Sequence, residues 1–323
     1  MVKNRILVLF VLVFFIGCSK MQVTGEVVRD IPSETMNDMS VYFCPQDDCE
    51  QVLIDVIDSA TKSVHCALFD LDLKDLINVI GKKSYSVEVK LVVDNENYGS
   101  IIGPGVRKDT SSQFSHNKFC VVDGKVITTG SMNPTDNGAD KNNNNLLVLY
   151  SKYLAINYED EFKELWNGSF GKGDIVEYPV IYLNGHEIEN YFCPEDNCAD
   201  RIVDELNGAS KSIYFMVFSF TNEEIADAIL FNDKAVVKGL FEKRGSGSKY
   251  SQYNRLKDFG IDVRLDTNGF TMHHKVFIID ERIVITGSMN PTGAGDGKND
   301  ENVLIIHDKT IARKYIEEFE RLY

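Results

Sequence analysis

Two short segments of this 323-residue chain carry a histidine, a lysine, a serine and an asparagine at matching intervals. The first reads HNKFCVVDGKVITTGSMN from His116, and the second reads HHKVFIIDERIVITGSMN from His273. A histidine can act as a nucleophile or transfer a proton near neutral pH, and a lysine with neutral donors can hold an anion. Together these side chains suit chemistry on an anionic tetrahedral group such as a phosphodiester.

Each segment has the pattern of a β-hairpin, because a turn sequence separates two β-rich runs. We expect the loops to be Gly124-Lys125 and Glu281-Arg282. The expected cross-strand pairs are then Lys118 with Ser131, His116 with Asn133, Lys275 with Ser288 and His273 with Asn290. Residues two apart share a strand face, so each hairpin should present its four polar side chains as one cluster.

Two such clusters facing each other would supply a nucleophile on one side of a phosphorus atom and a proton donor on the other. The segments lack the carboxylates of a magnesium or two-zinc phosphodiesterase, and they lack a glycine-rich phosphate loop. Of the two adjacent histidines, only His273 is two residues from Lys275, while His274 occupies the position of Asn117 in the other copy.

The duplication extends far beyond the two segments. YFCPQDDC from Tyr42 recurs as YFCPEDNC from Tyr191, and each copy continues with alternating helix-like and strand-like runs that end in an amphipathic helix. This order predicts an α/β fold of two homologous halves related by a pseudo-twofold axis, with mixed sheets flanked by helices. The expected boundaries are a leader at 1–18, a tether at 19–39, a first half at 40–168, a linker at 169–190 and a second half at 191–323.

The spacing His-x-Lys, four residues, Asp, six residues, Gly-Ser-x-Asn resembles the motif of the phospholipase D superfamily, and it occurs here twice without a gap. The resemblance implies a metal-independent phosphodiesterase that needs no cofactor, has one active site between the halves and forms a phosphohistidine. It implies His116 and His273 as the catalytic pair and Lys118, Ser131, Asn133, Lys275, Ser288 and Asn290 as the phosphate-binding residues. The motif aspartates, Asp123 and Asp280, are expected to be structural and set back from the phosphate.

The two copies differ at one position beyond the motif. Relatives often place an acidic residue like Glu301 against the motif histidine, whereas the first copy has Asn144 at the corresponding position. A nearby carboxylate favours a protonated imidazole. We therefore expect Glu301 to support His273 as the general acid, and His116 to be the nucleophile.

The first twenty residues have the form of a secretory leader, with Lys3 and Arg5 before an apolar run from Ile6 to Ile16. FIGC resembles a lipobox, which makes Cys18 the expected site of lipidation; plain secretion or an uncleaved anchor is the alternative. We therefore expect an extracytoplasmic protein, either a membrane-anchored lipoprotein or a secreted one. Its net charge of −15 provides no general attraction to nucleic acid or anionic lipid.

The cysteine pairs Cys44 with Cys49 and Cys193 with Cys198 each close a small loop that contains a proline. We favour two local disulfides over a four-thiolate zinc site, because the compartment is oxidising. Cys66 and Cys120 lie in apolar strand-like runs and are expected to be buried thiols.

Three functions fit these observations. The favoured one is hydrolysis of phospholipid head groups by an enzyme that needs no obligate protein partner. The alternative is a nonspecific endonuclease, for which a loop with Lys243, Arg244 and Lys249 could form a local basic edge; a solvated charged loop is the preferred interpretation of that loop. The minor alternative is an inactive phosphate-binding module.

Overall fold

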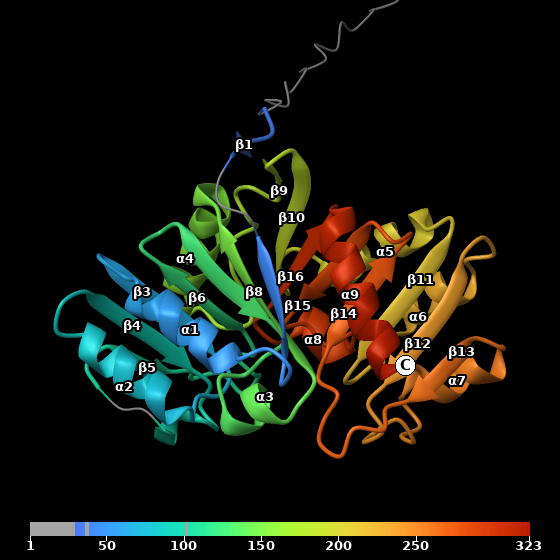
Figure 1. The fold of residues 1–323 in the computed structure, drawn as a ribbon, viewed down its shortest axis with the longest axis horizontal. Helices are drawn as coiled ribbons and strands as arrows, with labels where there is room; N and C mark the ends of the chain where they lie inside the picture. The colour runs from blue at the N-terminus through green and yellow to red at the C-terminus, as the bar shows by residue number, and fades with distance from the viewer. Residues whose placement is uncertain (1–29, 36–38, 101–102) are drawn as a thin grey trace, which may run out of the picture. The chain divides into compact units, whose positions relative to one another are not determined.

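The computed structural model describes residues 30–35, 39–100 and 103–323, and it shows two halves of the same design (Figure 1). Residues Ile31–Tyr323 form one structural unit. The expected leader at 1–18, Cys18 and most of the expected tether lie outside the described residues. No helix within the described ranges is both long and apolar enough to cross a membrane.

The first half is built on a seven-stranded mixed sheet with the order β2-β8-β7-β6-β3-β4-β5. Its strands are β2 (Ser40–Cys44), β3 (Ser63–Leu68), β4 (Glu88–Val93), β5 (Val106–Lys108), β6 (Lys118–Val122), β7 (Val126–Gly130) and β8 (Asn144–Tyr150). Its helices are α1 (Cys49–Asp58), α2 (Lys74–Lys83), the 3-10 turn η1 (Tyr98–Ser100), α3 (Asp136–Asp140) and α4 (Lys152–Trp166).

The second half repeats this order as β10-β16-β15-β14-β11-β12-β13. Its strands are β10 (His186–Cys193), β11 (Ser212–Val217), β12 (Val236–Phe241), β13 (Asp262–Leu265), β14 (Lys275–Ile279), β15 (Ile283–Gly287) and β16 (Glu301–Ile306). Its helices are α5 (Cys198–Gly208), α6 (Glu223–Leu230), α7 (Gln252–Asp258), α8 (Gly293–Gly297) and α9 (Lys309–Leu322). The expected α/β fold of two homologous halves is therefore confirmed.

Two further strands extend the second sheet and revise the expected tether and linker. β1 (Ser33–Glu34) pairs in parallel with β9 (Val180–Leu183), and β9 forms a hairpin with β10. The Glu34 carboxylate also accepts a hydrogen bond from the backbone N–H of Lys152 at 3.2 Å. The chain thus adds strands to the sheet at both places where the sequence predicts only a connection.

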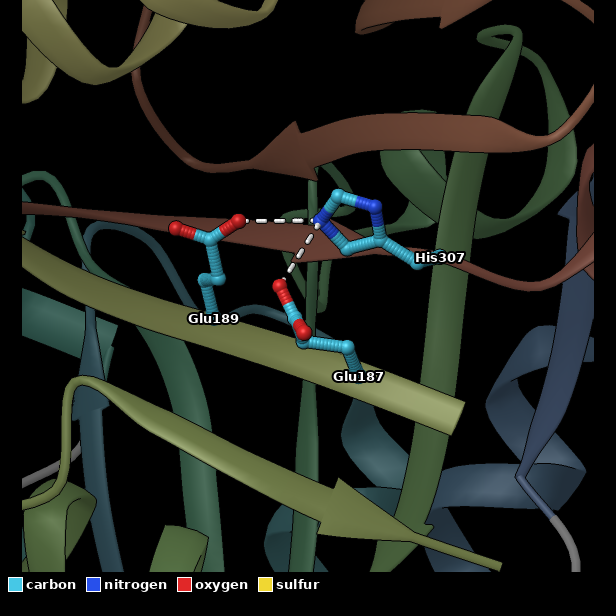
Figure 2. Close-up of side chains that lie close together, drawn as sticks. All are labelled: Glu187, Glu189 and His307. Carbon is cyan, nitrogen blue, oxygen red and sulfur yellow. Dashed lines mark hydrogen bonds and ion pairs between the residues drawn. The ribbon is translucent and has the colours of Figure 1, made fainter. Parts of the chain in front are cut away.

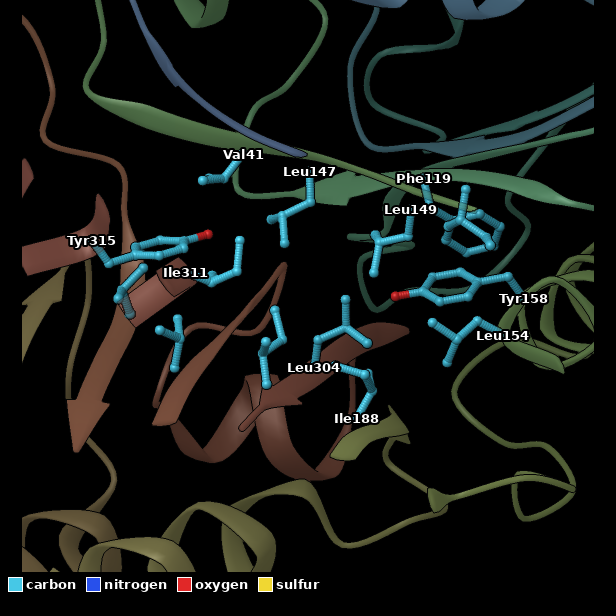
Figure 3. Packing of buried hydrophobic residues seen from close by; sticks show 14 of the residues in the cluster. Val41, Phe119, Leu147, Leu149, Leu154, Tyr158, Ile188, Leu304, Ile311 and Tyr315 are labelled. Carbon is cyan, nitrogen blue, oxygen red and sulfur yellow. The ribbon is translucent and has the colours of Figure 1, made fainter. Parts of the chain in front are cut away.

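A central apolar core lies between the two sheets (Figure 3). It combines Phe119, Leu147 and Tyr158 of the first half with Leu304 and Tyr315 of the second, all buried. Outer cores lie under α1 and α2 in the first half and under α5 and α6 in the second. Alternate strand residues therefore point to opposite cores, as expected for sheets covered on both faces.

Both motif hairpins have three-residue loops, so the expected cross-strand pairings were wrong by one residue. Val122 pairs with Val126, and Ile279 pairs with Ile283. Asp123 and Gly124 both have positive φ, and the Lys125 N–H donates back to the Val122 carbonyl at 3.1 Å. The sequence allowed more than one turn around Asp123, and the backbone of that turn decides the register.

The structure contains disulfides Cys44–Cys49 and Cys193–Cys198, as expected, and a third one that corrects a prediction. Cys66 on β3 and Cys120 on β6 are buried but joined, with their Cα atoms 4.0 Å apart. The two residues stand directly opposite in the antiparallel ladder, which sequence periodicity could not indicate. In the second half, Phe215 and Phe277 occupy a comparable opposed position on β11 and β14.

Candidate active site

The segments that lead into the two motif histidines are each hydrogen-bonded to the opposite half. The His116 N–H donates to the Asp300 carbonyl at 2.9 Å, and the Asp300 N–H donates to the Phe114 carbonyl at 3.0 Å. In the same way the His273 N–H donates to the Asn143 carbonyl at 2.8 Å. Each half therefore positions the histidine of the other, and both motifs meet at one site.

The expected partner of Glu301 was wrong. Its Oε2 atom lies 2.8 Å from Nδ1 of His116, and it also accepts a hydrogen bond from the Ser288 hydroxyl at 2.6 Å. The expectation assumed that each acidic or amide residue serves the histidine of its own half. Because the segments cross between the halves, residue 301 lies beside the histidine that is 185 positions earlier.

His273 lies against uncharged acceptors instead. Its Nδ1 is 2.9 Å from Oδ1 of Asn144 and 3.1 Å from the Ser131 carbonyl. Both partners accept hydrogen bonds, which places the ring proton on Nδ1 and leaves Nε2 without a proton. Nε2 lies 3.2 Å from Nζ of Lys275. The two histidines thus share a geometry but differ in the charge beside them.

Ser131 and Ser288 were expected to bind phosphate directly, and their surroundings contradict this. Both are fully buried. The Ser131 hydroxyl donates to Oδ1 of Asn144 at 3.1 Å and accepts from the Asn145 N–H at 3.0 Å. The Ser288 hydroxyl is likewise held between Glu301 and the Asn302 N–H. These hydroxyls therefore fix the residues that orient the histidines.

Lys118 and Lys275 are buried beneath the histidines, and each ammonium donates to the carbonyl of its own motif histidine. Burial lowers the pKa of Lys118 to about 7. Burial and repulsion from Lys118 also hold the pKa of Lys275 well below its ordinary value, while Glu301 opposes both shifts. A bound anion would offset this repulsion, so the lysines suit a site for one phosphate group.

Burial and the two lysines also lower the pKa of both histidines well below the ordinary value. Burial raises the pKa of the Glu301 carboxyl to about 8 in the free protein, while Lys118 and Lys275 lower it, so positive charge beside this carboxyl favours its ionised form. For His116, desolvation and the charges of Lys118 and Lys275 lower the pKa and outweigh the opposing effect of the Ser288 backbone. Without substrate, both imidazoles are therefore expected to be uncharged at neutral pH.

Asn133 and Asn290 line a pocket of about 540 Å³ together with both histidines. The side-chain oxygen of each asparagine is buried, and no hydrogen-bond partner for it is found among the described residues. Both asparagines therefore lie at the pocket with the two histidines, and their binding of phosphate stays a prediction.

The motif glycines are required by close packing beneath this pocket. Gly130 and Gly287 have φ values of 135° and 141°. A Cβ atom on them would lie 2.4 Å from the Asn145 carbonyl oxygen and 2.2 Å from that of Asn302. Any larger residue would push apart the strands that carry Asn144 and Glu301.

The motif aspartates lie at the far end of their hairpins, as expected for structural residues. The Asp123 carboxylate accepts hydrogen bonds from the backbone N–H groups of Thr61, Lys62 and Ser63. These bonds lower the pKa of Asp123 to about 2. Asp280 binds residues 210–212 in the same manner. Each aspartate therefore fastens its hairpin to the start of the neighbouring strand.

Sequence reasoning missed two aromatic side chains of the site. Phe69 packs edge-to-face against the His116 ring with centroids 4.8 Å apart, and Phe218 packs against His273 at the same distance. Lys118 and Lys275 lie 5.1 Å and 5.3 Å from these rings. The duplication could have indicated them, because each phenylalanine directly follows a strand at the equivalent position of the two halves.

His274 points away from the pocket, but it is fully buried in a polar network between the halves. Its ring nitrogens lie 3.1 Å from Nδ2 of Asn145 and 3.2 Å from Oε1 of Glu318. Asn117 makes the equivalent contacts, donating to Glu161 and accepting from Asn302. The second histidine of the pair is thus an interior residue.

Two clusters away from the pocket have side chains that could hold a metal ion. In one, shown in Figure 2, atoms of Glu187, Glu189 and His307 lie within 4.8 Å of one another. His307 Nε2 is 2.9 Å from Glu189, and this ion pair accounts for the cluster without a metal. The other consists of Glu161, Glu164 and Glu195, where burial raises the pKa of Glu195 to about 7.

Comparison with known proteins gives a consistent result. A family model described as "Cardiolipin synthase, PLD-like domain" matches residues 53–166 and 202–323. Phospholipase D of Rickettsia typhi is 34% identical over 145 residues, which cover 44% of this chain and 71% of that protein. The mitochondrial cardiolipin hydrolase of Xenopus laevis is 34% identical over 136 residues, which cover 41% and 65%.

Among solved structures, phosphatidylserine synthase of Haemophilus influenzae is similar with a TM-score of 0.64, covering 87% of this chain and 85% of that one at 14% identity. This similarity concerns the fold. The family model matches both halves, and the structure brings their motifs to one pocket. The chain therefore belongs to the phospholipase D superfamily and is a hydrolase of the phosphodiesterase type.

Proposed function

We propose that the protein hydrolyses the head-group phosphodiester of phospholipids without a metal ion, through a phosphohistidine. The observation that carries the choice of substrate is the lining of the pocket. Among the described residues, none that lines it is a lysine, arginine, aspartate or glutamate, and three are phenylalanines. A nucleic acid would bring further phosphates that need cations beside the one being cleaved.

The basic loop considered for a nuclease does not alter this choice. Lys243, Arg244 and Lys249 are absent from the pocket lining, as far as the described residues go. Arg244 instead donates to the Thr271 hydroxyl at 3.0 Å. The two relatives named above are called a phospholipase D and a cardiolipin hydrolase, which also supports a lipid substrate.

We retain His116 as the nucleophile, now for a different reason. Its Nδ1 proton is donated to Glu301, so the lone pair of Nε2 is free to attack. When Nε2 bonds to phosphorus, the ring gains positive charge, and the Glu301 carboxylate stabilises that charge. His273, beside Asn144, has no such carboxylate partner.

His273 then acts as the general acid. In the first step the bond from Nε2 of His116 to phosphorus forms, the bond from phosphorus to the head-group oxygen breaks, and a proton passes from Nε2 of His273 to that oxygen. In the second step His273 takes a proton from water as the water oxygen attacks phosphorus, and the nitrogen–phosphorus bond breaks. The negative charge of bound substrate raises the pKa of His273 enough for it to carry the proton.

Lys118, Lys275, Asn133 and Asn290 hold the nonbridging oxygens in this scheme. Two buried ammonium groups supply the positive charge that a metal ion supplies in other phosphodiesterases. Because one chain contributes both histidines, catalysis needs no obligate protein partner.

We further propose that the enzyme acts outside the cytoplasm, attached to a membrane by the lipid on Cys18. The leader-like start of the sequence supports this, as do the three disulfides among the described residues. Labelling with a palmitate analogue, with Cys18→Ala as the control, tests the anchor.

The test of function offers the purified protein phosphatidylcholine vesicles and, separately, plasmid DNA, both in EDTA. We expect phosphatidic acid from the vesicles, no DNA cleavage, and loss of activity in His116→Asn but not in His186→Asn, which alters an exposed histidine. DNA cleavage in place of lipid hydrolysis would reject the substrate. Complete loss in EDTA would reject the metal-free mechanism.

A further inference from the structure

Phe114 is an exposed aromatic residue at the pocket, two positions before His116. Its side chain is 41% exposed and lines the pocket. It packs edge-to-face on Phe69 with centroids 5.4 Å apart, and Phe69 in turn packs on the His116 ring. The three rings form a row from the surface to the proposed nucleophile.

The backbone around Phe114 is held firmly. The Phe114 carbonyl accepts from the Asp300 N–H at 3.0 Å, and the Ser115 N–H donates to the Asp94 carboxylate at 3.1 Å. The preceding turn is closed by Gln113 N–H donating to the Ser111 hydroxyl at 2.9 Å. A single exposed ring is common on protein surfaces, but this one is held at the pocket by a well-bonded loop, where it can contact an apolar part of the ligand.

The aromatic row occurs in only one half. The residue two positions before His273 is Thr271, whose hydroxyl is occupied by Arg244. Phe218 therefore has no counterpart of Phe114 stacked on it at that position, and the pair of phenylalanines that line the pocket lies beside His116. This asymmetry gives the two sides of the phosphate different environments.

We propose that Phe114 is a specificity-determining residue that contacts the diacylglycerol part of the phospholipid, next to the phosphate. This inference rests on the proposed function. In-line displacement places the departing head group on the side of His273, which protonates it. The ester that stays on phosphorus is the glyceride, which extends across the line between the two histidines, and Phe114 and Phe69 flank that line at the end away from the head group.

The test compares Phe114→Ala, Phe114→Trp and wild type on three substrates: long-chain phosphatidylcholine, long-chain phosphatidylglycerol and the soluble diester bis(4-nitrophenyl) phosphate. Phe231→Ala, which removes a 76% exposed ring elsewhere, is the matched control. Burying the exposed part of one ring against an acyl chain corresponds to roughly a 10-fold effect on kcat/KM.

We expect Phe114→Ala to lower kcat/KM about 10-fold for both lipids alike, to leave the soluble diester unchanged, and to be rescued by Phe114→Trp. Equal losses on all three substrates, or a loss confined to one head group, would overturn the assignment of Phe114 to the glyceride side. So would an unchanged rate on both lipids. If wild type cleaves the soluble diester but neither lipid, the proposed function itself fails, and this inference fails with it.

Discussion

Replacing Glu301 by glutamine removes the carboxylate that contacts His116 and retains its shape. The buried Oε2 lies 2.8 Å from Nδ1 of His116. The glutamine oxygen can still accept the ring proton, so the ring orientation is kept and only the charge is lost. The variant therefore measures what the negative charge contributes to phosphohistidine formation.

A charged hydrogen-bond partner contributes about 1.5 kcal/mol more than a neutral one. We therefore expect the rate of intermediate formation to fall about 10-fold. Glu301 also raises the pKa of Lys118 and Lys275, so its loss lowers both further. The lysines of the free enzyme then lose their protons at lower pH, and the alkaline limb of kcat/KM moves to lower pH.

The assay is the pre-steady-state burst of nitrophenolate released from an excess of bis(4-nitrophenyl) phosphate. This leaving group departs without a proton, so the burst reports the formation of the phosphohistidine. Glu301→Gln should slow the burst. The reciprocal change Asn144→Asp places a carboxylate beside His273 and should leave the burst rate unchanged. With lipid substrate, Asn144→Asp should raise the pKa of His273 and move the alkaline limb of kcat to higher pH.

The opposite pattern would refute the assignment of roles. If Glu301→Gln left the burst unchanged while Asn144→Asp altered it, His273 would be the nucleophile. Mass spectrometry of acid-free digests provides an independent check, since phosphate should be found on the peptide that contains His116.

Four further outcomes are expected. His273→Asn should retain a burst with the nitrophenyl diester but abolish lipid turnover. His274→Asn, which can copy the bonds of Asn117, should keep near wild-type kcat and lower the unfolding free energy by about 1–2 kcal/mol. His274→Ala should lower it by about 3 kcal/mol or more, and urea unfolding with kinetics checks both variants. Burial raises the pKa of Glu195 from 4.5 to about 7. Between these pH values the folded state holds a proton that the unfolded state has lost, so the stability of the fold falls as pH rises from about 4.5 to 7. Glu195→Gln should make the decrease of Tm across this pH range smaller. Gly287→Ala should lower Tm and the rate together, because its Cβ would lie 2.2 Å from the Asn302 carbonyl oxygen; an unchanged Tm would contradict the close packing described here.

Much of the fold was predictable because its signals are local or duplicated. The repeated order of strands and helices indicated two α/β halves, and cysteines five residues apart indicated Cys44–Cys49 and Cys193–Cys198. Hairpin register was harder, because Asp123-Gly124 and Gly124-Lys125 are both acceptable turn sequences. The structure has neither two-residue turn: the Lys125 N–H bonds to the Val122 carbonyl, and the loop contains three residues.

The sequence by itself determined which residue types gather at the site, since two unbroken copies of one motif must fold alike. Only the tertiary structure decided the partner of each histidine, because the bonds between His116 and Asp300 and between His273 and Asn143 exchange the partners between the halves. That exchange placed the carboxylate of Glu301 on His116 and the amide of Asn144 on His273. Burial and the bonds to Asn144 and Glu301 likewise decided that both serine hydroxyls are already occupied. Contacts between residues far apart in the chain depend on how the two sheets pack, and no local pattern contains that information.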